Sequence, residues 1–170
     1  LYDYYMFSAD RAVLNEVKDV LQVLLERFCG YTDENGIITD PPSYMFLDWL
    51  EIDGISLHHP PAALGQAALN AFYIGGLEKA AGIFKILGDN EDFEKYNKRC
   101  EKVKKSFNEY FYDTGKGLYF DGLNEDYPTK KWIPKNTDKR YFSQHTNSLA
   151  VLFDIAPKDE QKDLIERILN

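Results

Sequence analysis

A segment rich in aromatic and acidic side chains, residues 41–54, has the composition expected of a sugar-binding surface. Within it, Asp48 and Trp49 are adjacent, and Glu51 follows two positions later. Flat aromatic rings pack against the C–H face of a pyranose ring, and carboxylates accept hydrogen bonds from its hydroxyls. The same composition also fits a hydrophobic plug that closes a loop, and this alternative stays open. Asp48, Trp49 and Glu51 are therefore candidate substrate-binding residues.

A second group of candidates, Gln144 and His145, stands in the first turn of a predicted helix. The loop that holds the first group leads into another buried helix, so we expect both groups at the same end of the molecule. His145 shares its helix face with apolar residues, and a hydrogen-bonded core histidine is the alternative interpretation. Tyr119 and Asp121, in a strand-like stretch before this helix, complete the candidate set.

Several short motifs resemble ion-binding or phosphate-binding sites but do not have the spacing that such sites need. The stretch Asp33–Gly36 places its glycine too early for a calcium loop, and Gly115–Gly117 lacks the remainder of a phosphate loop. His58 and His59 are adjacent, so their side chains diverge and do not share a metal ion. The two cysteines lie on apolar sides of helical patterns and are expected to be buried small residues. The sequence therefore predicts no metal and no cofactor.

Helical periodicity accounts for most of the chain. An amphipathic helix is predicted from Asp10 to about Gly30, a helix buried on most sides over residues 62–87, and a half-exposed helix after Gly88. A third pair repeats this order, with a mainly apolar helix over residues 142–153 and a polar helix opened by Pro157. Buried helices followed by amphipathic ones predict an array of αα-hairpins with an inner and an outer layer.

The connections between these helices alternate in length. Short turns at residues 8–10, 88–90 and 156–157 contrast with long loops over residues 29–61 and 113–141. Loops of this length inside a compact domain are usually functional. The Asn35-Gly36 dipeptide and the Gly115–Gly117 turn predict short β-hairpins within them. We therefore expect an all-α fold whose long loops, decorated by small hairpins, meet at one end.

The net charge of −8 opposes binding to nucleic acid and to anionic lipid surfaces. No apolar run approaches the length of about 18 residues that a membrane span needs. The sequence therefore predicts neither a nucleic acid nor a membrane as a partner.

In order and spacing, a set of short motifs resembles the middle of bacterial α-L-rhamnosidases, which are six-hairpin glycoside hydrolases. The resemblance covers nearly the whole chain. Its motifs are Asp3-Tyr4-Tyr5, Ser8-Ala9-Asp10, Phe46-x-Asp48-Trp49, Leu69-Asn70-Ala71-Phe72-Tyr73, Leu87-Gly88, Gly117-x-Tyr119-x-Asp121, Ser143-Gln144-His145 and Ile155-Ala156-Pro157.

The resemblance implies part of an (α/α)6 toroid, with residues 1–170 forming a single partial domain. It also implies an inverting hydrolase in which one carboxylic acid protonates the leaving oxygen and a second carboxylate activates water. In the family, these two groups lie in loops before and after the matching region, and nothing in this sequence matches them. The chain would thus supply walls of the sugar pocket, with Asp48 as hydroxyl acceptor and Trp49 as wall, and would be inactive alone.

The rival hypothesis is a non-catalytic module of helical hairpins that binds a glycan or a peptide at the same end. Both hypotheses share one physical expectation. A partial toroid exposes apolar helix faces at its edges, and exposed apolar faces favour self-association.

Overall fold

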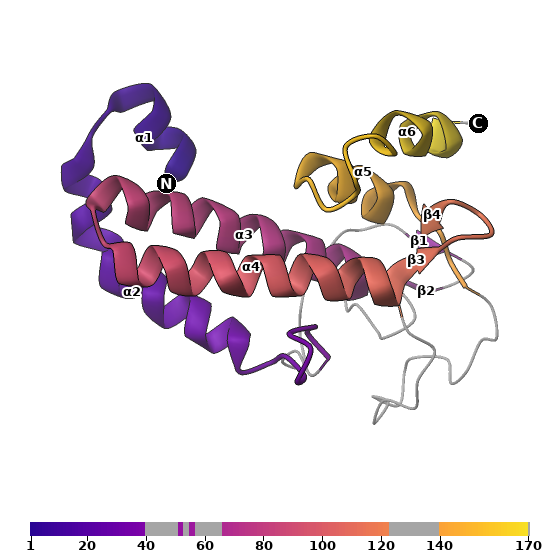
Figure 1. Ribbon diagram of the computed structural model, residues 1–170, viewed down its shortest axis with the longest axis horizontal. Coiled ribbons are helices and arrows are strands. Elements are labelled where there is room, and N and C mark those ends of the chain that lie inside the picture. The colour runs from indigo at the N-terminus through magenta and orange to yellow at the C-terminus, as the bar shows by residue number, and fades with distance from the viewer. Residues whose placement is uncertain (40–50, 53–54, 57–65, 123–139, 170) are drawn as a thin grey trace.

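A computed structural model describes residues 1–39, 51–52, 55–56, 66–122 and 140–169, with only the backbone of 51, 52, 55 and 56 (Figure 1). These residues form six α-helices. They are α1 (Tyr2–Ser8), α2 (Arg11–Cys29), α3 (Gln66–Leu87), α4 (Asn90–Phe111), α5 (Gln144–Leu152) and α6 (Gln161–Leu169). α3 and α4 lie side by side, α2 packs on α3, and α5 and α6 lie toward one end of this pair. The predicted all-α hairpin array is confirmed.

Three helices begin where the sequence places a capping side chain. Asp10 accepts a hydrogen bond from the Ala12 amide at 2.9 Å, and Asp89 accepts one from the Asp92 amide at 3.1 Å. Ser143 caps α5 through its hydroxyl. Each cap satisfies an amide that the helix itself leaves without a partner. Gly88, with φ of +81°, makes the turn between α3 and α4.

α3 is buried on most sides because small residues let its neighbours approach closely. A Cβ atom at Gly75 would lie 2.5 Å from the Phe153 ring, and one at Gly82 would lie 2.7 Å from the Tyr2 ring. These glycines therefore admit aromatic rings from the residue after α5 and from α1. On the α4 side, Phe84 stacks on Tyr96 with 5.2 Å between ring centroids. The prediction of a helix buried on most sides is confirmed.

A polar seam joins α2 to α4 on the outer layer. The Glu26 carboxylate accepts hydrogen bonds from Lys95 at 2.9 Å, Tyr96 at 3.0 Å and Arg99 at 3.2 Å. Burial opposes ionisation of Glu26, but these three donors outweigh it and lower its pKa to about 2. The seam fixes the lateral position of α2 against α4.

Both predicted hairpins are present. After α2, Thr32 forms an isolated antiparallel bridge with Ile38, and Gly36 adopts a φ of +85° in the turn. After α4, β3 (Tyr112–Asp113) pairs antiparallel with β4 (Leu118–Tyr119), with Tyr112 opposite Tyr119. A third hairpin, β1 (Glu51–Ile52) paired with β2 (Ile55–Ser56), was not predicted from the sequence.

Three details differ from the sequence-based expectation. The last helix begins at Gln161 instead of Pro157, because residues 157–160 form a turn in which the Glu160 amide donates to the Pro157 carbonyl at 3.0 Å. Cys29 is only half-buried, whereas Cys100 is buried and burial raises its thiol pKa to about 11. On α2, Val20 is exposed although it belongs to the apolar stripe. Within the described residues, no helix combines the length and hydropathy of a membrane span.

Candidate functional site

The structure describes four of the seven predicted substrate-binding residues completely: Tyr119, Asp121, Gln144 and His145. Asp48 and Trp49 lie outside the described residues, and Glu51 is described only as the first backbone position of β1. The four described residues come from β4, the residues after it, and the first turn of α5. The structure therefore brings together the second group of candidates and leaves the first group as a prediction.

The Asp121 side chain lies inside the structure and holds the start of α5. Its carboxylate accepts hydrogen bonds from the Ser143 amide at 3.1 Å, from the Ser143 hydroxyl at 2.6 Å and from the Thr146 hydroxyl. The backbone of Asp121 also accepts from the Ala67 amide at 2.9 Å and donates to the Tyr141 carbonyl at 2.8 Å. One residue thus ties the segment after β4 to the first turn of α3 and the first turn of α5.

Burial opposes ionisation of this acid. Asp121 is only 1% exposed, and the loss of hydration raises its pKa although Ser143, Thr146 and the charge of His145 favour the carboxylate. A buried carboxyl group with three hydrogen-bond donors is well suited to hold a helix terminus.

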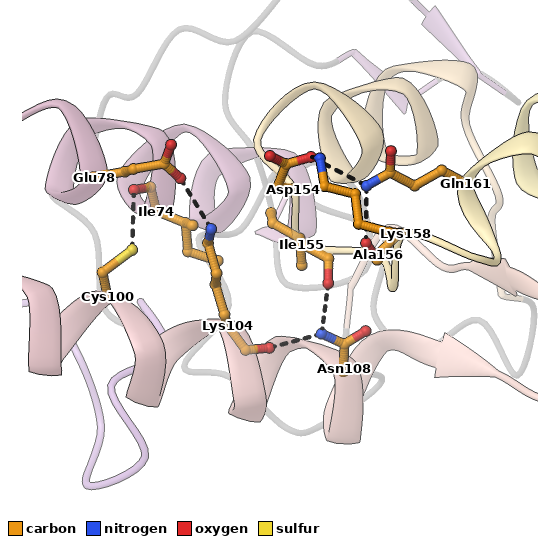
Figure 2. A network of polar contacts seen from close by, with 10 residues as sticks. All are labelled: Ile74, Glu78, Cys100, Lys104, Asn108, Asp154, Ile155, Ala156, Lys158 and Gln161. Atoms are coloured by element: carbon orange, nitrogen blue, oxygen red, sulfur yellow. Dashed lines mark hydrogen bonds and ion pairs between the residues drawn. The ribbon is translucent and has the colours of Figure 1, made fainter.

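Tyr119 is fully buried and packs within the scaffold. Its hydroxyl donates to Asn108 at 2.5 Å, and its backbone exchanges hydrogen bonds with Asn147 of α5. Asn108 in turn donates to the Ile155 carbonyl at 2.9 Å and so fixes the turn between α5 and α6 to α4, as Figure 2 shows. Burial raises the pKa of Tyr119. These contacts give Tyr119 and Asp121 a structural role, and their contact with substrate stays a prediction.

The two residues of the first turn of α5 differ in environment. Gln144 is exposed, and its side chain donates to the Ile168 carbonyl of α6 at 3.1 Å. His145 is half-buried and lies close enough to Asp121 for its charge to act on that carboxylate. Of the four described candidates, these two have side chains with accessible surface.

Sequence reasoning missed Asn108 and Asn147, which make the hydrogen bonds that fix β4. Both are amide side chains that stand in otherwise helical patterns, where asparagine is a poor helix former. A buried polar side chain in an apolar helix needs partners, and this was the signal available for Asn147.

A cavity of about 150 Å³ lies between the β3–β4 hairpin and α6. The Tyr112 hydroxyl donates to Glu160 at 3.0 Å at its edge, and burial raises the pKa of Tyr112. The remaining lining residues are Gly117, Tyr119, Ala156, Asp163, Leu164 and Arg167. Of the four described candidates, Tyr119 alone lines it, and neither Gln144 nor His145 of the first turn of α5 does. Among the described residues, no group of three or more His, Cys, Asp or Glu side chains could hold a metal ion.

The model of the bacterial α-L-rhamnosidase six-hairpin glycosidase domain matches residues 1–170. The chain belongs to this family. The family predicted from the sequence motifs is thereby confirmed, and so is the six-hairpin fold class. A comparison with curated proteins finds no match.

Solved structures agree with the fold of this rhamnosidase domain. A rhamnosidase from Klebsiella oxytoca with rhamnose bound superposes with a TM-score of 0.72 at 17% sequence identity, over 99% of this chain and 28% of that protein. A GH78 family rhamnosidase of Bacillus sp. GL1 gives a TM-score of 0.71 at 16% identity, over 97% of this chain and 16% of that protein. The chain thus spans less than a third of either relative.

Proposed function

We propose that this chain is part of a glycoside hydrolase that removes terminal α-L-rhamnose with inversion, and that it supplies walls of the sugar pocket. The observation that carries this proposal is the match of the six-hairpin rhamnosidase domain over all 170 residues. The rhamnose bound to the Klebsiella oxytoca relative supports the choice of sugar.

The chemistry requires two carboxyl groups that this chain does not identify. An inverting enzyme protonates the glycosidic oxygen with an acid and deprotonates an attacking water with a base, and the two groups stand about 6.5–9.5 Å apart. The bond between the anomeric carbon and the leaving oxygen breaks as the water oxygen bonds to that carbon. In this proposal both groups lie in other segments of the intact protein, so the isolated chain is inactive.

This chain contributes to binding in two places. Asp48 and Glu51 accept hydrogen bonds from rhamnose hydroxyls, and Trp49 packs against the apolar face of the ring. Gln144 and His145 contact the sugar from the first turn of α5, where both have accessible surface. Tyr119 and Asp121 support this site, because their described hydrogen bonds hold β4 and the start of α5 together.

The test uses the intact protein that contains this chain, with aryl α-L-rhamnoside, aryl α-D-mannoside and aryl β-D-glucoside as substrates. We expect release of the aryl group from the rhamnoside alone. Hydrolysis of another glycoside in its place would change the substrate class. Binding of rhamnose without hydrolysis of any of the three would support the rival hypothesis of a non-catalytic glycan-binding module.

A further inference from the structure

We propose that Asn70 and Asn147 are equivalent positioning residues, each of which fixes the chain entering a long loop to the inner helix that follows that loop. The functional part of this proposal rests on the proposed sugar site, whereas the structural part rests on described hydrogen bonds alone. The two asparagines bind the hairpin after α2 and the hairpin after α4, respectively.

Asn70 lies one turn into α3 and holds Ile38, which stands 32 positions earlier. Its side-chain oxygen accepts from the Ile38 amide at 2.8 Å, and its side-chain nitrogen donates to the Ile38 carbonyl at 3.3 Å. The same nitrogen donates to the Gln66 carbonyl at 2.9 Å within α3. The side chain of Gln66 adds a second donor to the Ile38 carbonyl at 3.1 Å.

Asn147 makes the same set of contacts in α5. Its side-chain oxygen accepts from the Tyr119 amide at 2.8 Å, and its side-chain nitrogen donates to the Tyr119 carbonyl at 2.9 Å, across 28 positions. The same nitrogen donates to the Ser143 carbonyl at 2.9 Å, four residues earlier in the chain. Each asparagine therefore bonds both backbone groups of one residue and one carbonyl of the turn before it.

Packing alone does not account for these asparagines. Both asparagine side chains are fully buried, and so are their partners Ile38 and Tyr119. Burial of an amide is costly unless its donors and acceptor are used, and here three hydrogen bonds use them at each position. An alanine would fill an apolar helix as well but would leave the amide and carbonyl of an extended residue without partners.

The hairpins that present these residues are also alike. In each, an aspartate at the start of the turn accepts amide hydrogen bonds and a glycine adopts a positive φ. Asp33 accepts from the Asn35 and Ile37 amides, and Gly36 has a φ of +85°. Asp113 accepts from the Gly115 and Lys116 amides, and Gly117 has a φ of +64°. The clamp is therefore one feature of a repeated unit of outer helix, hairpin and inner helix.

The clamps set where each long loop leaves the scaffold. Asn70 joins the end of the first hairpin to the start of α3. Between these two segments, the structure describes only the backbone of residues 51, 52, 55 and 56. Asn147 joins β4 to α5, whose first turn carries Gln144 and His145. Since the proposed sugar contacts occur after Ile38 and in the first turn of α5, we expect both asparagines to act on sugar affinity without touching the sugar.

The test is amide hydrogen exchange in the intact protein, comparing Asn70→Asp, Asn147→Asp and the control Asn97→Asp, which makes the same change at an exposed position of α4. Aspartate keeps the acceptor but turns an oxygen toward the two carbonyls that the amide nitrogen had served. We expect Asn70→Asp to raise exchange at Ile38 by about tenfold and leave Tyr119 unchanged, Asn147→Asp to do the reverse, and the control to do neither. Exchange that rises equally at both residues in both variants, or at neither, would overturn the clamp.

Rhamnose affinity of the same folded variants tests the positioning role. We expect Asn70→Asp to bind rhamnose at least about fivefold more weakly, because its sugar-binding groups are displaced. Amide hydrogen exchange in α4 should stay unchanged. A local change in exchange with unaltered rhamnose affinity would overturn the positioning role. If Asn70→Asp does not fold, Asn70→Ser is used instead, and amide exchange should again rise at Ile38 and not at Tyr119. Absence of rhamnose binding in the unmodified protein would reject the proposed function and leave the exchange test decisive for the clamp.

Discussion

The Ser143 hydroxyl donates a hydrogen bond of 2.6 Å to the buried carboxylate of Asp121, which stands 22 positions earlier in the chain. The same hydroxyl accepts from the Thr146 amide at 3.2 Å and so caps α5. A helix cap is thus anchored to a residue two positions after the end of β4. This relationship couples the start of α5 to the hairpin after α4.

Asp121→Asn is predicted to loosen α5. Asparagine has only one side-chain oxygen, so it cannot accept from both the Ser143 amide and the Ser143 hydroxyl as the carboxylate does. A buried donor is therefore left without its partner. Because hydrogen bonds to a charged group contribute about 1.5–3 kcal/mol each, we expect the free energy of opening of α5 to fall by about 2 kcal/mol. Hydrogen exchange of the α5 amides measures this change.

The matched control is Asp154→Asn, which makes the same substitution in an exposed ion pair with Lys158. Exposed pairs contribute little, so a loss below about 0.5 kcal/mol is expected there. Equal losses of opening free energy in the two variants would show that the Asp121 hydrogen bonds stabilise α5 no more than an exposed ion pair does.

Glu26 is predicted to make stability depend on pH in the acid range. The pKa of Glu26 is about 2 in the folded chain against an ordinary value of 4.5, so its contribution to folding stability is present above pH 4.5 and is lost as the pH falls toward 2. Its side chain is 45% exposed, so solvent screening holds this contribution below about 1 kcal/mol. Glu26→Gln should therefore melt at a lower temperature than the parent chain at pH 7 and at the same temperature near pH 2. Curves that stay parallel over this range would contradict the role of the Lys95, Tyr96 and Arg99 donors.

Helical periodicity predicted most of the scaffold correctly. The capping residue Asp10, the small residues of α3 and the Gly88 turn act locally, and local signals are visible in a single sequence. Asn35-Gly36 and Gly115–Gly117 predicted their hairpins for the same reason. The start of the last helix was misplaced because proline is accepted both at the first position of a helix and in a turn.

The described part of the candidate site was harder to predict because its bonds link distant segments. Asp121 was proposed as a sugar ligand because it follows the strand-like stretch next to the helix of Gln144 and His145, whereas its described partners are Ser143 and Thr146, more than twenty positions away. The role of Asn147 depends on the Tyr119 backbone, which no side-chain pattern reveals. Periodicity gives the face of a helix on which a residue lies, but not the element that covers it.

Exposed apolar side chains on α2 predict self-association of the 170-residue chain. Val20 and Val23 are 69% and 70% exposed, and with Leu24 they share one helix face. Light scattering is expected to give a mass above that of the monomer. Val20→Glu combined with Val23→Lys should shift the chain toward the monomer, whereas Lys98→Glu on the polar face of α4 should not. A monomeric parent chain would contradict this prediction.

Asp48→Ala tests the proposed sugar contact directly. Loss of a charged acceptor for a sugar hydroxyl should lower kcat/KM of the intact protein for an aryl α-L-rhamnoside by about tenfold to a hundredfold. The melting temperature should not change, and Asp19→Ala, on an exposed position of α2, should retain full activity. Unchanged kinetics in Asp48→Ala would remove this residue from the site.

The most direct test of the account is the anomeric form of the first product. Proton NMR of the intact protein acting on an aryl α-L-rhamnoside distinguishes the two anomers of free rhamnose before they interconvert. An inverting rhamnosidase must release β-L-rhamnose first, because water attacks the face opposite the leaving group. Initial appearance of β-L-rhamnose is the predicted result, and initial appearance of the α anomer, or no release of rhamnose, would contradict the account.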